Sequence, residues 1–303
     1  MTEHRSGFAC FVGRPNAGKS TLTNALVGSK VAITSSKPQT TRHAIRGIVH
    51  REDAQLVLID TPGLHRPRTL LGERLNDIVH TTWSEVDVVG LCVPANEKIG
   101  PGDKFIAAEL QKIALRKNGR GTPVIGIVTK TDLVQPQQVA EQLLALQGVM
   151  DFAELIPVSA VDGFQVGALA DLLVQKLPEG PQLYPGGELT DEPEQTLVAE
   201  LIRESALEGV RDELPHSIAV TVEEMLPREG RDDLIDVHAF LYVERPSQKG
   251  IILGHKGERL REVGATARKN IEALLGSKVY LDLHVKVAKE WQRDPRQLRR
   301  LGF

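Results

Sequence analysis

The chain has 303 residues, of which 41% are apolar and 25% charged, values typical of globular proteins, so wholesale disorder and a fibrous architecture are excluded. At roughly 100 to 200 residues per domain, this length predicts two domains that each bury a core. No apolar run approaches the ~18 residues of a membrane-spanning helix and no signal-peptide core follows the first residues, so we expect a cytoplasmic protein.

Short apolar runs alternate with segments of helical period over residues 1–177. The runs that we interpret as buried strands are 8–12, 56–59, 86–93, 124–128 and 155–158. Because strands that are apolar on both faces and separated by helices are typical of parallel sheets, this pattern predicts an α/β domain with a doubly wound, mostly parallel sheet.

Residues 178–193 are rich in proline and glycine and are interpreted as a linker. A smaller α+β domain is then expected over residues 194–303. Its predicted elements are a helix at 194–208, strands near 218–222 and 237–243, a short helix before Gly254, a helix at 258–275 and a strand at 279–287.

The clearest motif lies between the first predicted strand and a helix at 21–27. It matches G-x-x-x-x-G-K-[ST] and consists of Gly13, Arg14, Pro15, Asn16, Ala17, Gly18, Lys19 and Ser20. In such a loop the backbone N–H groups and the following helix N-terminus, here with Thr21, bind phosphates. Lys19 is predicted to bridge the β- and γ-phosphates, and the Ser20 hydroxyl to hold Mg²⁺.

Three further motifs follow the ends of later strands, at the sheet edge where ligands bind in this kind of fold. The first is Asp60, Thr61, Pro62 and Gly63, in which Asp60 is expected near Mg²⁺ and the Gly63 N–H near the γ-phosphate. The others contain Thr129, Lys130 and Asp132, and then Ser159 and Ala160. A carboxylate at 132 can accept hydrogen bonds from guanine N1 and its 2-amino group, which adenine does not offer, so Asp132 is predicted to select guanine.

Charge is distributed unevenly along the chain. Residues 194–244 hold 4 basic and 13 acidic side chains, whereas residues 245–303 hold 14 basic and 6 acidic ones. The basic segment indicates a polyanionic partner such as nucleic acid or a membrane surface. A solvated face balanced by the acidic segment before it explains the charge equally well.

Taken in order, the four motifs resemble the translation-factor class of GTPases. With the segment 38–43, which reads P-Q-T-T-R-H, and the C-terminal module, nearly the whole chain resembles the Era family of bacterial GTPases. The resemblance implies hydrolysis of GTP to GDP with Mg²⁺ as cofactor, with Lys19, Asn16, Thr41 and Gly63 as the catalytic residues. In that family a threonine of the first switch reaches Mg²⁺, so the metal ligands would be Ser20, Asp60 and Thr41, with Thr40 as the alternate.

The tetrapeptide 254–257, G-H-K-G, lies between two predicted helices in the basic segment. In that context it resembles a K-homology domain, whose G-x-x-G loop clamps about four nucleotides of single-stranded RNA. Phosphate contacts are expected from Lys249, His255, Lys256 and Arg259, extended by Lys286 and Lys289, with Gly254 and Gly257 allowing close approach. Bases would lie against Ile251, Ile252 and Leu253, since only 4% of residues are aromatic, which argues against a stacking platform.

Three positions bear on nucleotide affinity and on the rate of hydrolysis. Most Era-like proteins have asparagine where this chain has Thr129, so we expect weaker nucleotide binding with guanine preference retained. Leu64 stands where Ras-like proteins have a water-orienting glutamine, so intrinsic hydrolysis should be slow. Asn16 resembles the asparagine that positions K⁺ in related GTPases, which makes K⁺ a second expected ion.

The resemblance implies binding to the 3′ end of small-subunit ribosomal RNA during maturation of the small ribosomal subunit. Two alternatives remain open. One is a GTPase partner of an RNA-modifying enzyme, and the other is an RNA-binding protein whose nucleotide site is largely structural. Peripheral association with the inner face of the cell membrane is a further expectation of the basic segment.

Overall fold

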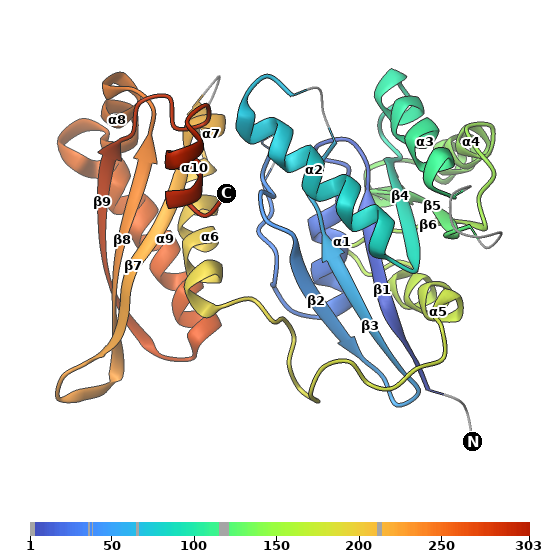
Figure 1. Ribbon diagram of the computed structural model, residues 1–303, viewed down its shortest axis with the longest axis horizontal. Helices are drawn as coiled ribbons and strands as arrows, with labels where there is room; N and C mark the ends of the chain where they lie inside the picture. Colours follow the sequence, from blue (N-terminus) through green and yellow to red (C-terminus); the bar gives the residue numbers. More distant parts are fainter. Residues whose placement is uncertain (1–3, 36, 38, 65–66, 115–120, 211–213) are drawn as a thin grey trace. The chain divides into compact units, whose positions relative to one another are not determined.

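The computed structural model describes residues 4–35, 37, 39–64, 67–114, 121–210 and 214–303. The chain forms two compact units (Figure 1). The first comprises Met1–Thr34, Thr41–Arg66 and Arg74–Asp191, and the second comprises Ser35–Thr40, Pro67–Glu73 and Glu192–Phe303. In the described residues, no helix is long and apolar enough to cross a membrane.

A six-stranded sheet forms the centre of the first unit, in the order β2-β3-β1-β4-β5-β6. Its strands are β1 (Arg5–Val12), β2 (Ile45–His50), β3 (Ala54–Asp60), β4 (Val88–Pro94), β5 (Val124–Thr129) and β6 (Glu154–Pro157). Only β2 is antiparallel to its neighbour, which confirms the predicted mostly parallel sheet. The five predicted strands are present, whereas β2 was not predicted.

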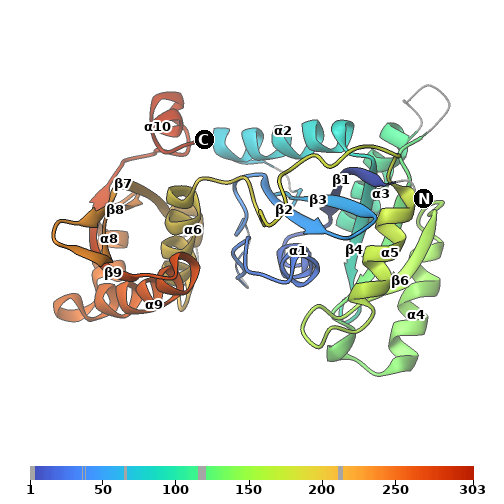
Figure 2. The ribbon, with the colours of Figure 1, turned by 90° about the horizontal axis from the view of Figure 1, so that it is seen from below.

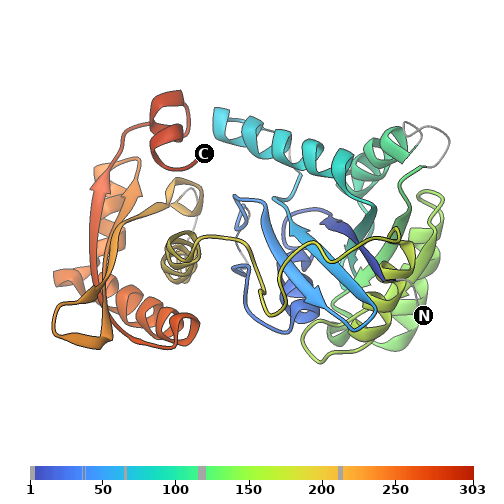
Figure 3. The ribbon, with the colours of Figure 1, turned by 60° about the horizontal axis from the view of Figure 1, so that its bottom comes forward.

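Helices cover both faces of this sheet, as in a doubly wound fold. They are α1 (Lys19–Val27), α2 (Leu70–Glu85), α3 (Pro101–Ala114), α4 (Pro136–Gln147) and α5 (Val166–Lys176), with a short 3₁₀ turn η1 (Thr131–Leu133). Side chains of α1 and α5 share one buried cluster, and those of α2, α3 and α4 share the other. Figure 3 shows α2 and α1 on opposite faces of the strands. The polar loops at the carboxyl ends of the strands are thereby left open for a ligand.

The segment predicted as a linker makes ordered contacts with the first unit. The Leu183 and Tyr184 N–H groups donate to the Gln55 amide oxygen Oε1 at 2.7 and 2.9 Å, and the Ile48 N–H donates to the Leu189 carbonyl at 2.9 Å. Residues 178–191 therefore follow the edge of the sheet near β2 and β3.

The second unit is an α+β domain with a three-stranded sheet in the order β7-β8-β9. Its elements are α6 (Glu194–Leu207), α7 (Leu214–Ser217), β7 (Ala219–Arg228), β8 (Arg231–Val243), α8 (Pro246–Leu253), η2 (His255–Gly257), α9 (Glu258–Leu275), β9 (Lys278–Val287) and α10 (Pro295–Arg300). Apolar side chains of α6, α8 and α9 pack with those of β8 and β9 in one buried cluster. Figure 2 views this sheet nearly end-on, with α6 and α9 along one side.

Candidate nucleotide and RNA sites

The loop between β1 and α1 has the backbone that the phosphate-binding motif requires. Gly13 has φ +155°, and a Cβ there would lie 2.6 Å from the Cys92 carbonyl oxygen, which no real side chain tolerates. Asn16 and Gly18 have φ values of 63° and 86°, in the left-handed region. Such an alternation of backbone conformations is typical of loops whose successive N–H groups bind anions.

Lys19 begins α1 and lies beneath this loop with 7% of its surface exposed. Its Nζ donates to the carbonyl oxygens of Gly13 and Arg14 at 3.3 and 3.1 Å. Burial lowers the pKa of Lys19, and the nearby Asp60 carboxylate opposes that shift. A buried ammonium held by two loop carbonyls is placed to meet the β- and γ-phosphates.

The three predicted metal ligands come together beside Lys19. Ser20 Oγ donates to Asp60 Oδ2 at 2.7 Å, Thr41 Oγ1 donates to the same oxygen at 3.1 Å, and the two hydroxyl oxygens are 3.0 Å apart. Two hydroxyls and a carboxylate form an all-oxygen set, which suits Mg²⁺, and their spacing resembles the ~3 Å between neighbouring ligands in an octahedron with bonds of ~2.1 Å. Of the two candidate threonines, the structure therefore brings Thr41 to this cluster.

The segment after β3 approaches the phosphate loop through its backbone. A Cβ on Gly63 would lie 3.0 Å from the Pro15 nitrogen, and the Thr61 hydroxyl donates to the Phe11 carbonyl oxygen at 3.1 Å. Leu64 is 6% exposed and belongs to the buried cluster under α2, α3 and α4. Its side chain is apolar and turned into the core, so it cannot orient a water molecule.

A cavity of about 220 Å³ lies beside the phosphate loop, at the ends of β5 and β6. It is lined by Gly18, Thr21, Leu22, Thr129, Lys130, Asp132, Leu133, Val158, Ala160 and Val161. Ser159 Oγ donates to Asp132 Oδ1 at 2.8 Å and so fixes the orientation of this carboxylate. The predicted base-reading residues are thus brought together around one cavity.

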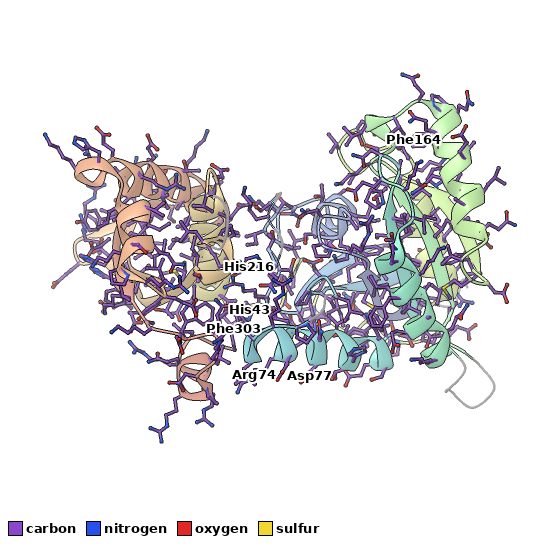
Figure 4. All side chains as sticks on the ribbon, turned by 90° about the horizontal axis from the view of Figure 1, so that it is seen from above. His43, Arg74, Asp77, Phe164, His216 and Phe303 are labelled. Carbon is purple, nitrogen blue, oxygen red and sulfur yellow. The ribbon has the colours of Figure 1, made fainter. Side chains whose placement is uncertain are left out.

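The loop between β6 and α5 supports this cavity. The Ser159 N–H donates to the carbonyl of Phe164, a half-exposed residue labelled in Figure 4. Leu22, Leu133, Val158 and Val161 line the cavity but were not predicted. Each lies within two residues of a predicted residue, so its position next to a motif is the sequence feature from which it could have been predicted.

Thr129 ends β5 and is 4% exposed. Its hydroxyl donates to the Ala17 carbonyl oxygen in the phosphate loop at 2.8 Å. Threonine therefore ties the base loop to the phosphate loop, although its single donor is used in doing so.

Arg14 does not point to the phosphates, although it belongs to the predicted motif. Its Nε and Nη2 donate to Asp103 and Glu97 at 2.9 and 3.0 Å. Asp103 is 1% exposed, so the pair is largely shielded at its carboxylate end. Arg14 is therefore committed to holding the phosphate loop against α3.

The G-x-x-G turn of the second unit joins α8 to α9. Gly254 has φ +68°, and a Cβ there would lie 2.7 Å from Arg259 Cβ, while Gly257 has φ +78°. His255 and Lys256 between them are exposed. The glycines let an RNA backbone approach the turn closely, and the two exposed polar or charged side chains can contact its phosphates. The turn therefore suits the clamping of a phosphate backbone.

Three predicted RNA contacts are placed differently by the structure. Ile252 is fully buried, so it packs α8 onto the core of the second unit and cannot contact a base. Arg259 Nη2 donates to the Glu208 carbonyl oxygen at 2.5 Å, which ties α9 to the end of α6. Lys286 lies over the Phe240 ring, on the sheet face opposite the helices. Ile251 is 54% exposed beside the turn and Leu253 partly buried, and both remain available.

Comparison with known proteins finds a family match in each of the two units. A family described as 50S ribosome-binding GTPase matches residues 8–130, and one described as KH domain matches residues 213–292. A GTPase Era from Streptomyces coelicolor is 70% identical, with 100% of this chain and 96% of that protein covered. A GTPase Era from Mycolicibacterium smegmatis is 67% identical over 100% of both chains.

Two solved structures resemble the whole chain. A single-residue variant of Aquifex aeolicus Era bound to GDP·AlF4⁻ has a TM-score of 0.93 at 35% identity, covering 98% of this chain and 99% of that one. Era in complex with MgGDPNP and nucleotides 1506–1542 of 16S ribosomal RNA has a TM-score of 0.92 at 36% identity, covering 99% of each chain. This chain, a P-loop GTPase unit followed by a KH unit, belongs to the GTPase Era family.

Proposed function

We propose that this chain is a GTP-driven switch that binds RNA near the 3′ end of small-subunit ribosomal RNA and assists maturation of the small ribosomal subunit. The observation that carries the proposal is the convergence of Ser20, Thr41 and Asp60 on one point next to Lys19. A related protein is known in complex with MgGDPNP and a fragment of 16S ribosomal RNA. That complex supports both the nucleotide and the RNA assignment.

In the GTPase unit, the loop N–H groups and Lys19 bind the phosphates, while Ser20, Thr41 and Asp60 hold Mg²⁺. When bound, Mg²⁺ neutralises charge on the β- and γ-phosphate oxygens. Thr41 is the residue through which the nucleotide state acts, because the oxygens that it shares with Ser20 and Asp60 are those that Mg²⁺ would hold together when GTP is bound. Gly63 adds a backbone N–H beside the phosphate loop.

Asp132 selects guanine, because a carboxylate held by Ser159 accepts the N1–H and 2-amino donors of that base. Ala160 lines the same cavity, and its backbone N–H is our proposed donor to the 6-keto oxygen of guanine. Lys130, with φ 57°, begins the turn that places Asp132. Guanine preference therefore rests chiefly on Asp132.

Hydrolysis is intrinsically slow, since the buried Leu64 cannot position the attacking water. Asn16, exposed on the phosphate loop, would hold a K⁺ ion, which would supply positive charge to the transition state. Steady-state hydrolysis should be faster in K⁺ than in Na⁺ at matched ionic strength, and an Asn16→Ala variant should lose this difference. Equal rates in the two salts would contradict the K⁺ assignment.

The KH unit binds single-stranded RNA at the turn of Gly254, His255, Lys256 and Gly257, with Lys249 and Lys289 extending the cationic path. We place the protein in the cytoplasm, on the small ribosomal subunit. Peripheral contact with anionic lipid at the inner membrane face is a further property of the basic segment. Sedimentation with vesicles containing anionic lipid, compared with neutral vesicles, tests that contact.

The central test is a titration of labelled RNA ending in the small-subunit ribosomal 3′ sequence against a scrambled RNA, with a non-hydrolysable GTP analogue or with GDP. Selective binding that is tighter with the analogue is the expected result. Equal binding in both nucleotide states would remove the switch. Absence of GTP hydrolysis, even with RNA and small subunits added, would favour an RNA-binding protein with a structural nucleotide site.

A further inference from the structure

The sheet of the KH unit has a second face that the proposed RNA clamp does not use. Along β8 and β9, alternate residues such as Leu241 and Val285 pack under the helices, so their neighbours point the other way. We call this second side the outer sheet face, and define it by His238, Phe240, Tyr242, Tyr280, Asp282, His284 and Lys286. Two of the chain's three tyrosines lie on it, although aromatic residues are only 4% of the sequence.

Rings and cations are stacked on this face. Lys286 Nζ lies 3.0 Å from the centroid of the Phe240 ring, and the Arg300 guanidinium lies 5.6 Å from that of Tyr242. The Phe240 and His284 rings are paired across the two strands, with centroids 6.0 Å apart and planes tilted by 42°. Within the described residues, neither Lys286 nor Arg300 forms an ion pair with a carboxylate.

The accessible part of this face lies on β9. The His284 side chain is 61% exposed, Tyr280 is 50% exposed and Lys286 is exposed as well. Tyr242 is buried beneath Arg300, whose Nη2 donates to the tyrosine hydroxyl at 3.3 Å. Toward the β7–β8 turn, by contrast, Arg228 is paired with Asp236 at 2.6 Å. Cations without carboxylate partners are therefore at the end of the sheet nearest α10.

The exposed His284 ring and the partly buried Phe240 ring, beside Lys286, match the chemistry of single-stranded RNA. A base stacks on an aromatic face whatever its identity, and ammonium and guanidinium groups bind the phosphates on either side. Lys286 covers Phe240 in a cation–π contact that it can exchange for a base and a phosphate. A lipid surface would also use these charges, but it takes up aromatic rings that project from a protein. Phe240 and His284 are instead paired across two strands of the sheet, so the charges and the rings together favour RNA.

We propose that the outer sheet face is a second RNA-binding surface, in which bases stack on the Phe240–His284 pair and phosphates contact Lys286 and Arg300. It takes RNA that extends beyond the nucleotides held at the G-x-x-G turn, and so rests on the proposed RNA-binding function. Lys286 then serves this surface and not the clamp.

The test compares two RNAs on the full chain, with the GTP analogue present throughout. One has about six nucleotides, enough for a clamp that holds about four, and the other carries the same sequence extended to about sixteen. A double variant, His284→Ala with Lys286→Gln, should weaken binding of the long RNA about ten-fold and leave the short RNA unchanged. Lys278→Gln is the matched control, because it removes one exposed charge at the opposite end of β9.

A second readout reports stacking directly. A 2-aminopurine base in the extension should be quenched on the wild-type protein and on the Lys278→Gln variant, but not on the double variant. If the double variant loses affinity for both RNAs by equal factors, Lys286 belongs to the clamp and the proposal is overturned. Unchanged affinity for the long RNA, or a loss matched by Lys278→Gln, would overturn it too.

Lys256→Gln separates the two proposals, since it should lower the affinity for both RNAs if the G-x-x-G turn is the RNA clamp. If Lys256→Gln has no effect while the double variant weakens the long RNA, the clamp assignment fails and the outer sheet face stands. If neither RNA binds the wild-type chain, both fail. Circular dichroism of each variant checks that the KH unit remains folded.

Discussion

The Thr129 hydroxyl donates to the Ala17 carbonyl oxygen at 2.8 Å, and this bond ties the base loop to the phosphate loop. An asparagine amide there has two N–H donors, so it can keep that bond and offer a second one to the base. We expect Thr129→Asn to bind GDP roughly ten-fold more tightly, and Thr129→Val to bind it about ten-fold more weakly, because the buried carbonyl loses a partner worth ~1–3 kcal/mol. Titration calorimetry measures both.

Guanine preference should survive in both variants, since Asp132 and Ser159 are untouched. ATP competing effectively against labelled GDP on the wild-type chain would contradict the assignment of base selection to Asp132. A Thr129→Asn variant no tighter than wild type would mean that this position does not limit affinity.

Lys19 makes the stability of the GTPase unit depend on pH. Burial lowers its pKa in the folded chain, whereas an unfolded lysine titrates near ~10.4. Between the two values the unfolded state binds more protons, so stability rises with pH in that window and is constant below it. We therefore measure the free energy of unfolding in urea for the nucleotide-free wild type and for Lys19→Met. The difference between the two, wild type minus variant, should rise between neutral pH and about pH 10. A parallel pair of curves would show that Lys19 keeps its ordinary pKa.

Residue types in the motifs predicted which side chains gather at the site, but not how each one is oriented. The convergence of Ser20 and Asp60 follows from chain order, because Ser20 lies at the start of α1, just after the loop that follows β1, and Asp60 ends the neighbouring parallel strand β3. The choice of Thr41 over Thr40 and the diversion of Arg14 to Asp103 depend on contacts between distant segments. Spacing along the chain carries no information about such partners.

Among the elements, apolar runs predicted the strands that are buried on both faces. β2 was missed because it is an edge strand interrupted by the exposed Arg46 and by Gly47. β8 begins at Arg231, earlier than its apolar part, since its polar start pairs with β7 in a long hairpin. Helix α9 matched its predicted bounds because its apolar residues follow a helical period and glycines stand at both ends.

The α8–α9 turn offers a matched pair of glycine substitutions. A Cβ on Gly254 would meet Arg259 Cβ at 2.7 Å in a left-handed backbone, whereas Gly264, within α9, has open space around it. Gly254→Ala should therefore distort the turn and abolish most RNA binding. Gly264→Ala should leave RNA binding intact and stabilise the KH unit by ~0.5–1 kcal/mol.

Filter binding and thermal melting report these two outcomes separately. A Gly254→Ala variant that binds RNA normally would mean that the turn is not the clamp. A Gly264→Ala variant that loses binding would show that the effect of alanine is not specific to the turn.

At the scale of the whole molecule, two compact units with separate buried clusters predict two unfolding transitions. GDP with Mg²⁺ binds only the GTPase unit, so it should raise the free energy of unfolding of that unit, by ~2.7 kcal/mol at a ligand concentration about 100 times the dissociation constant. RNA should raise the free energy of unfolding of the KH unit. Each shift identifies the unit that holds the ligand, independently of any activity.

Scanning calorimetry with each ligand alone and with both together carries this further. If the switch couples the units, RNA binds more tightly when the GTP analogue is bound than when GDP is bound. Because linkage makes the effect of each ligand on the other reciprocal, RNA should then stabilise the GTPase unit more in the presence of the analogue than in the presence of GDP. Shifts that are independent of one another would leave two functional units on one chain with no free energy passing between them. A single transition moved by either ligand would instead show that the units unfold together, and the coupling would then have to be measured from binding constants alone.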